Sequence, residues 1–349
     1  MKRLNTVEIK VGKVAIGRNA PIALQSMTNT DTKDAKSTIE QIHKLEKAGC
    51  DIVRCAVPDM EACESLKTIS KEVSIPLVAD IHFDYRLALK SIENGVSALR
   101  INPGNIGSID KVEMVVKSAK ERNIPIRIGV NSGSLKKDIL NKYGRVCPEA
   151  LVESVLEHVS ILENMGFYNI VISIKSSNVN DMVESYRQIS KLVNYPLHLG
   201  VTEAGTLWRG TIKSSIGIGT LLMEGIGDTI RVSLTGNPLE EIRVGREILK
   251  ACGYLKEGIE FISCPTCGRT KIDLIKIAEE VEKRLSNVDK NIKVAVMGCV
   301  VNGPGEAKEA DIGIAGGIGE GLIFKKGKVL RKVKEENLVD ALIEEVKNI

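Results

Sequence analysis

The stretch DIVRCAVPDMEACESLKTISKEVSIPLVADIHF, at residues 51–83, indicates how most of the chain folds. Its two ends, DIVRCAV at 51–57 and PLVADIHF at 76–83, are short apolar runs with β-branched residues, which is typical of buried strands. Between them, residues 61–72 carry apolar side chains three or four apart, the spacing of an amphipathic helix. A strand, a helix and a second strand in this order predict a βαβ unit with parallel strands.

The same alternation continues on both sides of this unit. Helical spacing occurs at 37–47, 111–121, 150–165, 180–192 and 239–251. Further strand-like runs are IALQSM at 22–27, ALRINPG at 98–104, PIRIGVN at 125–131, IVISIKSS at 170–177, PLHLGVTEAG at 196–205 and TIRVSLTG at 229–236. Eight strands separated mostly by helices predict an α/β fold of the (β/α)8 or TIM-barrel type rather than an open sheet. We assign this substrate-binding barrel to residues 1–254.

The pattern changes after residue 251, and we assign residues 255–349 to a smaller α+β domain. A helix is predicted at 270–285, a strand at 293–296, a basic hairpin at 322–329 and a terminal helix at 334–346. The glycine-rich run IAGGIGEG at 314–321 lacks the strand, GxGxxG and helix context of a nucleotide-binding loop, so a tight turn is predicted there.

The composition excludes several classes of function. The chain has 349 residues, 3% aromatic residues and a net charge of +4, which is a poor match to a base-stacking platform or a basic nucleic-acid surface. No apolar run approaches the ~20 residues of a membrane span. The polar start MKRLNTVEIK is unlike a secretory signal, so the eight cysteines are expected to be reduced and the protein to be cytoplasmic.

Cations occur late in several of the predicted strands, where TIM barrels bind their ligands. A barrel interior does not tolerate many unpaired positive charges, and nearby Asp80 and Glu203 are too few to balance them. We therefore expect a phosphorylated ligand. The cations are Arg54, Arg100, Arg127, Lys175 and Arg231, and neutral hydrogen-bonding groups at the same strand ends are Asn102, Asn131, Ser173, Thr202 and Ser233.

Two motifs in the last third of the chain supply metal ligands. CPTCGRT at 264–270 contains Cys264 and Cys267, and MGCVVNGPGEA at 297–307 contains Cys299 and Glu306. Three thiolates with a weak carboxylate ligand suit an iron–sulfur cluster that keeps one position accessible to a substrate. A structural zinc site also uses CxxC pairs, but the second pair is missing here. The chain also lacks the CxxxCxxC run of radical-SAM enzymes.

Three other interpretations stay open on the residues alone. A non-redox barrel enzyme of the dihydropteroate synthase kind explains the barrel and its anion pocket but not the cysteines. An iron–sulfur regulator or electron carrier explains the cysteines but not the strand-end cations. A zinc-stabilised binding module explains least.

Six motifs, taken together and in order, resemble the 4-hydroxy-3-methylbut-2-enyl diphosphate synthase family. They are LRINPGN at 99–105, RIGVNSGSL at 127–135, LGVTEAG at 199–205, IGIGTLLMEGIGDTIRVSLT at 216–235 and the two cysteine motifs. The resemblance, to the compact bacterial two-domain form, implies reductive ring opening and dehydroxylation of 2-C-methyl-D-erythritol 2,4-cyclodiphosphate in the methylerythritol phosphate route to isoprenoids. It also implies a [4Fe-4S] cluster in a domain similar to a sulfite and nitrite reductase module. Reduced flavodoxin or ferredoxin as electron donor, and a homodimer with composite active sites, are implied as well.

The same resemblance assigns roles to individual residues. It implies Cys264, Cys267, Cys299 and Glu306 as cluster ligands, with Glu203 as the candidate for proton handling and Glu306 also in the catalytic set. It implies that the substrate is bound by Arg54, Arg100, Asn102, Arg127, Asn131, Lys175, Thr202, Arg231, Ser233 and Asn302.

Overall fold

The computed structural model describes residues 3–286, 288, 290–299, 305 and 307–349. It divides into two compact units, Met1–Leu255 and Lys256–Ile349, each with its own core. The division lies next to the expected one, between residues 254 and 255. The units are described separately.

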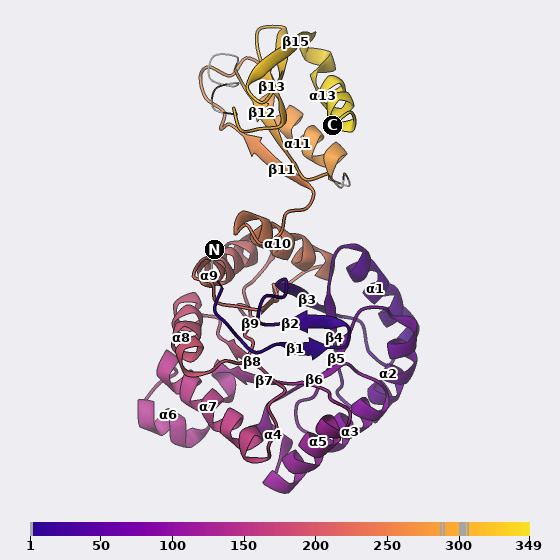
Figure 1. The fold of residues 1–349 in the computed structure, drawn as a ribbon, viewed down its shortest axis with the longest axis vertical. Helices are drawn as coiled ribbons and strands as arrows, with labels where there is room; N and C mark the ends of the chain where they lie inside the picture. The colour runs from indigo at the N-terminus through magenta and orange to yellow at the C-terminus, as the bar shows by residue number, and fades with distance from the viewer. Residues whose placement is uncertain (1–2, 287, 289, 300–304, 306) are drawn as a thin grey trace. The chain divides into compact units, whose positions relative to one another are not determined.

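The first unit is a barrel of eight parallel strands (Figure 1), as predicted. The strands follow the order β8-β7-β6-β5-β4-β3-β10-β9, and a parallel bridge between Ile172 and Leu197 joins the two end strands. The Tyr186 hydroxyl links the same two strands, since it accepts from the Ile174 N–H at 2.9 Å and donates to the His198 carbonyl. The strands are β3 (Ala23–Met27), β4 (Ile52–Ala56), β5 (Leu77–Asp80), β6 (Ala98–Ile101), β7 (Ile126–Asn131), β8 (Ile170–Lys175), β9 (His198–Leu199) and β10 (Thr229–Ile230).

Helices follow the strands and surround the barrel (Figure 1). Several begin at an acidic or amide N-cap, such as Asp34, Asp59 and Asn178, whose side chains accept from free N–H groups of the first turn. The helices predicted from apolar spacing are present as α1 (Ala35–Lys47), α2 (Met60–Glu72), α5 (Ile109–Glu121), α7 (Pro148–Asn164), α8 (Val179–Leu192) and α10 (Pro238–Ala251). The structure adds α3 (Tyr85–Glu93), α4 (Pro103–Ile106), α6 (Lys137–Tyr143) and α9 (Leu207–Met223). No helix among the described residues is long and apolar enough to cross a membrane.

A short hairpin closes the lower end of the barrel, where the strands begin. It consists of β1 (Ile9–Val11) and β2 (Val14–Ile16), which pair antiparallel. Its apolar side chains pack on the first inward residues of five barrel strands, namely Ala23, Ile52, Val78, Ala98 and Val171. The barrel therefore has an apolar floor.

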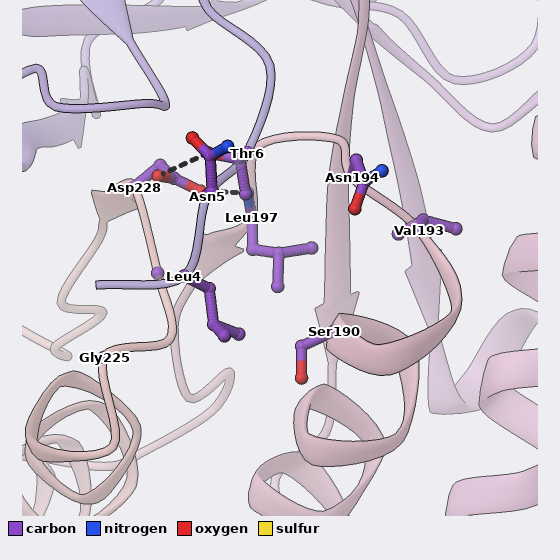
Figure 2. A pocket seen from close by; sticks show the side chains of 10 residues that line it. Leu4, Asn5, Thr6, Ser190, Val193, Asn194, Leu197, Gly225 and Asp228 are labelled. Carbon is purple, nitrogen blue, oxygen red and sulfur yellow. Dashed lines mark hydrogen bonds between the residues drawn. The ribbon is translucent and has the colours of Figure 1, made fainter. Parts of the chain in front are cut away.

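The chain before this hairpin is held by a buried carboxylate at the same end of the barrel. Asp228 accepts from Thr6 Oγ1 at 3.0 Å and from the Leu197 N–H at 2.9 Å, and it forms an ion pair with Arg3 at 2.6 Å. These contacts lie beside a cavity of about 180 Å³ that Leu4, Asn5 and Thr6 help to line (Figure 2). Asp228 thus fixes the first described residues to the barrel.

The second unit is a five-stranded mixed sheet with helices on one face. Its order is β11-β12-β13-β14-β15, with β11, β12 and β13 parallel and the rest antiparallel. The elements are β11 (Ile259–Ser263), α11 (Leu274–Leu285), β12 (Ile292–Met297), β13 (Ile312–Gly316), β14 (Glu320–Lys325), β15 (Lys328–Lys334) and α13 (Leu338–Lys347). The basic hairpin is confirmed as β14 and β15, while β11 was not predicted.

The glycine-rich run is a strand as well as a turn, which corrects the sequence-based prediction. Its first residues belong to β13, and the turn is confined to the residues before β14. Side chains occupy the space that these glycines leave open. A methyl group on Gly316 would lie 2.6 Å from Ile272, and one on Gly321 would lie 2.8 Å from Leu338. Gly316 and Gly321 therefore serve core packing, whereas Gly319, with a φ of 67° and nothing within 4 Å of an added methyl group, serves the turn.

A buried histidine on α7 makes the stability of the barrel depend on pH. His158 is 2% exposed, and its Nδ1 has no hydrogen-bond partner among the described residues. Burial, followed by the nearby Lys136 charge, lowers the pKa of His158 to about 4. Folding therefore favours the neutral imidazole.

We predict that the contribution of His158 to stability is lost in acid. The unfolded histidine titrates near pH 6.5, so stability present above that pH falls as the pH drops toward about 4, by roughly 3 kcal/mol in total. Denaturant unfolding of a His158→Gln variant across this range should lack that part of the pH dependence. The exposed His43→Gln control should retain it. Parallel curves for wild type and His158→Gln would contradict the prediction.

Candidate active site

The barrel interior is lined by alternate residues of each strand, because successive side chains of a strand point to opposite faces. Above the apolar floor, two residues further along their strands, the inward positions become polar. They are Gln25, Arg54, Asp80, Arg100 and Ser173, and all of them are buried. From one tier of inward residues to the next, the barrel interior therefore changes from apolar to polar and charged side chains.

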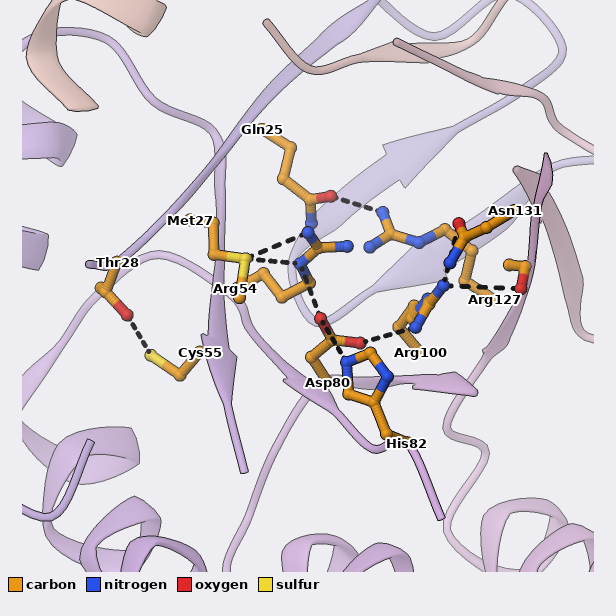
Figure 3. Close-up of polar contacts among 11 residues, drawn as sticks. Gln25, Met27, Thr28, Arg54, Cys55, Asp80, His82, Arg100, Arg127 and Asn131 are labelled. Atoms are coloured by element: carbon orange, nitrogen blue, oxygen red, sulfur yellow. Dashed lines mark hydrogen bonds and ion pairs between the residues drawn. The ribbon is translucent and has the colours of Figure 1, made fainter. Parts of the chain in front are cut away.

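Asp80 is the carboxylate that balances this tier (Figure 3). Its two oxygens lie 3.5 Å from Arg54 Nε and 3.2 Å from Arg100 Nη1, and His82 Nε2 lies 3.7 Å away. Burial by itself raises the pKa of Asp80. The Arg54 charge, a His82 hydrogen bond and the Arg100 charge outweigh burial and hold this pKa well below its usual range. Asp80 is therefore ionised, and it is the one described carboxylate that forms ion pairs with the barrel cations.

The remaining cations repel one another in a dry environment. Burial, followed by repulsion from Arg54, lowers the pKa values of Arg127 and Lys175 well below their ordinary values. Burial also lowers the pKa of Arg54 to about 9, although Asp80 opposes this shift. Among the described residues, the barrel cations therefore outnumber the carboxylate that pairs with them, and a bound anion would relieve the repulsion and favour their charged forms.

Several N–H donors of the same arginines point to the type of anion. Each is buried and has no hydrogen-bond partner among the described residues. An unsatisfied buried donor costs about 1–3 kcal/mol, so a ligand with several acceptor oxygens would stabilise the barrel. A phosphate or diphosphate has this chemistry. The donor atoms are Arg54 Nη1, Arg100 Nε, Arg127 Nε and Nη2, and Arg231 Nε.

The expectation that all the cations lie late in their strands is wrong for Arg127. Arg127 is the second residue of β7, yet it is the register partner of Arg100, the third residue of β6. Strands of a closed barrel are tilted and staggered, so an early residue of one strand can lie level with a later residue of its neighbour. Lys175 ends β8 and pairs in register with Asn131, and Arg231 directly follows β10.

The neutral groups predicted for the barrel mouth have distinct local roles. Asn102 caps α4, because its Oδ1 accepts from the Gly104 N–H at 3.1 Å. Thr202 and Ser233 are half-buried.

Glu203 is exposed and has a φ of 51°, a left-handed conformation that is strained for a residue with a side chain. Strain of this kind is common at functional positions, and it accompanies the proposed proton-handling group.

Sequence reasoning missed two residues of β3 that hold the arginines. Gln25 Oε1 accepts from Arg127 Nη1, and Met27 Sδ accepts from Arg54 Nε at 3.2 Å and Nη2 at 3.0 Å (Figure 3). A polar residue at an inward position of an apolar strand was the available signal for Gln25. No local pattern identifies Met27, because a thioether is a weak acceptor and methionine ordinarily fills apolar cores.

The candidate metal centre lies in the second unit, at the ends of two neighbouring parallel strands. Cys264 follows β11, and Cys299 lies two residues after β12. Because Ser263 and Val296 are register partners, the two loops leave the same edge of the sheet. The Gly298 N–H donates to Cys264 Sγ at 3.1 Å, which joins the two cysteine motifs.

The donor atoms have the chemistry of thiolate ligands. Cys267 is exposed in a turn closed by the Thr270 N–H, which donates to its carbonyl at 3.0 Å. A hydrogen bond from the Arg269 backbone is the main cause of the lowered pKa of Cys267. A lowered thiol pKa and an N–H donor to sulfur both favour the thiolate form that binds metals. Among the described residues, no three histidine, cysteine, aspartate or glutamate side chains lie together so that they could hold a metal ion. Asn302 and Glu306 lie outside the described residues.

We predict that removal of the Asp80 charge destabilises the barrel until an anion binds. Asp80→Asn leaves Arg54 and Arg100 without their shared counter-charge, so the free energy of unfolding should fall by roughly 3–5 kcal/mol. Thermal unfolding should show a larger stabilisation by inorganic pyrophosphate in this variant than in wild type. The exposed Asp138→Asn serves as a matched control and should behave as wild type. Equal stability of Asp80→Asn and wild type without anion would refute the shared-partner assignment.

Two family models match the chain, one in each unit, and so do relatives over their full length. Residues 6–246 match the model of the GcpE TIM-barrel domain, and residues 260–348 match that of the GcpE protein C-terminal domain. The chain is 75% identical over its full length, and over all of the relative, to "4-hydroxy-3-methylbut-2-en-1-yl diphosphate synthase (flavodoxin)" of Clostridium acetobutylicum. It is 71% identical, with the same complete coverage, to the enzyme of that name from Clostridium tetani.

A solved structure resembles this chain in its fold. The crystal structure of dihydropteroate synthase from Stenotrophomonas maltophilia superposes with a TM-score of 0.52 at 13% identity, covering 70% of this chain and 96% of that one. At this identity the likeness is one of fold, and it agrees with the barrel described above. Since the family models match most of both units, the chain belongs to the GcpE family.

Proposed function

We propose that this chain catalyses the reductive ring opening and dehydroxylation of 2-C-methyl-D-erythritol 2,4-cyclodiphosphate to (E)-4-hydroxy-3-methylbut-2-enyl diphosphate, a step of isoprenoid biosynthesis. The observation that carries the proposal is the excess of buried positive charge around Asp80. A cyclic diphosphate supplies the negative charge and the acceptor oxygens that this site lacks. The names of the full-length relatives support the same reaction.

The barrel residues bind the substrate and prepare its leaving group. Arg54, Arg100 and Arg127 receive the diphosphate, and neutralisation of its charge makes it a better leaving group. Lys175 and Arg231 continue the positive surface above them. Thr202 helps to bind the substrate, and Glu203 supplies the proton when the hydroxyl departs as water. Asn102, Asn131, Ser233 and Asn302 orient the rest of the substrate.

The thiolates of the second unit would hold the redox group. Cys264, Cys267 and Cys299 would bind a [4Fe-4S] cluster, with Glu306 as its weak fourth ligand. When bound, such a cluster passes on single electrons from reduced flavodoxin and offers a Lewis-acidic iron. Reduced ferredoxin is the alternative donor. The free state of all eight cysteines supports a reducing compartment, and we place the enzyme in the cytoplasm.

Anaerobic turnover tests this proposal directly. The purified protein with its cluster is mixed with the cyclic diphosphate and a strong one-electron reductant, and the product is identified by phosphorus NMR. We expect the linear allylic diphosphate. Recovery of unchanged cyclic substrate from a protein with a full complement of iron would refute the assigned reaction.

The proposed cluster ligands predict an unequal response to substitution. Loss of Cys264, Cys267 or Cys299 removes a strong thiolate, so anaerobically purified serine variants should lose their iron and their visible absorption. Glu306→Ala removes a weaker ligand and should retain much of its iron while turnover falls. Full activity and full iron content in Glu306→Ala would exclude Glu306 as a ligand.

We also propose a homodimer in which each active site draws its cations from one subunit and its cluster from the partner. The barrel contributes the anion site and the second unit contributes the thiolates, so each subunit carries both halves of the chemistry. Head-to-tail pairing of two copies would then build two composite sites.

Subunit exchange provides the test of this arrangement. Arg127→Ala and Cys299→Ser are each inactive by design, but their heterodimer contains one site with an intact arginine and an intact cysteine. Mixing them should restore activity to about half of the wild-type value per heterodimer. Mass spectrometry must first demonstrate exchange. Exchange without any return of activity would show that each site lies within one chain.

A further inference from the structure

Strand β7 has no side chain at its middle inward position. Its inward residues are Arg127, Gly129 and Asn131, because alternate residues of a strand face the same side. The neighbouring strand β6 contributes Arg100, the register partner of Arg127. The side chain of Arg100 does not stay level with Arg127. It crosses β7 at Gly129. It then reaches toward Asn131 (Figure 3).

The contacts of Arg100 define this crossing. Its Nη1 donates to Asp80 Oδ1 at 3.2 Å on one side. Its Nη2 lies 3.5 Å from both the Gly129 carbonyl and Asn131 Oδ1 on the other side. The guanidinium thus spans from β5 across its own strand to β7. The residue is 2% exposed, so it has little freedom to take another path.

Any side chain at residue 129 would occupy the place of this guanidinium. A methyl group built on Gly129 would lie 2.8 Å from Arg100 Nη2 and 2.9 Å from Cζ, and closer still to Nε. Carbon atoms do not approach at such distances. The nearest atoms belong to the middle of a side chain held at both ends, so Arg100 would have to give up Asp80 or Asn131 to make room.

We infer that Gly129 is a positioning residue for the anion site, because the absence of a side chain there lets Arg100 lean toward the barrel mouth and present its charge to the ligand. Gly129 does not touch the substrate in this role; it acts through Arg100. The inference rests on the proposed function for the identity of the ligand but not for the geometry. It predicts that Gly129→Ala weakens anion binding only while Arg100 is present.

A double-mutant cycle tests this dependence. Wild type, Gly129→Ala, Arg100→Ala and the double variant are compared by calorimetric titration with the cyclic diphosphate and, separately, with inorganic pyrophosphate. Gly129→Ala should weaken binding roughly 10- to 100-fold, with a matching rise in KM, while the visible spectrum of the cluster is unchanged. In the Arg100→Ala background the same substitution should have no further effect. A loss of equal size in both backgrounds would overturn the inference, as would wild-type binding by Gly129→Ala.

Two further comparisons separate this inference from effects on folding. Gly133 lies in the turn that follows β7, and a methyl group there meets nothing within 4 Å, so Gly133→Ala should bind as wild type. An equal loss in Gly133→Ala would also overturn the inference. If Gly129→Ala alone fails to fold, the double variant should fold, since removal of Arg100 frees the space. If both variants fail to fold, the strand itself requires glycine whether or not Arg100 is present, and the inference is overturned.

The choice of ligands separates this inference from the proposed function. Wild-type protein that binds pyrophosphate but not the cyclic diphosphate would contradict the proposed substrate. The double-mutant cycle of Gly129→Ala and Arg100→Ala would then be measured with pyrophosphate alone, and the same outcomes would support or overturn the role of Gly129.

Discussion

The excess of buried positive charge in the barrel is the constraint on which the rest of the structure depends. Arg54 and Arg100 share the carboxylate of Asp80, while Arg127 and Lys175 have pKa values lowered by burial and mutual repulsion. A charge without a partner in a dry interior costs several kcal/mol. The fold must therefore hold these side chains in place against their repulsion until an anion arrives.

The surrounding architecture supplies that support. Outward residues of the strands pack beneath the helices in one continuous apolar core, and the hairpin β1–β2 covers the lower end of the barrel. Neutral and polar neighbours then fix the arginines, as Gln25 fixes Arg127 and Met27 fixes Arg54. A low-dielectric setting strengthens the attraction for a diphosphate, because fewer waters compete for the same donors.

Both units use the ends of parallel strands to gather chemically active groups. In the barrel, Asn131 and Lys175 end their strands and Asn102 and Arg231 directly follow theirs, at the face where TIM barrels build their active sites. In the smaller sheet, the ends of β11 and β12 carry the two cysteine motifs, which the contact between Gly298 and Cys264 brings together. Parallel neighbours finish at one edge, so residues far apart in sequence converge without any special loop. The anion site and the thiolate site are thus built by the same rule.

The sequence by itself determined the repeating strands and helices, the identity of the cations and the two cysteine motifs. These features are local, since apolar periodicity and motif spacing can be read within a few tens of residues. Only the tertiary structure decided which groups meet. The stagger of the barrel places Arg127 level with Arg100, and Asp80 becomes the shared partner of two arginines from neighbouring strands. Gly129 matters because the side chain of another strand crosses it, and the glycines of β13 and β14 matter because Ile272 and Leu338 fill the space beside them. Such relations depend on register and strand tilt, which arise from closing the whole sheet and leave no signal in any one segment.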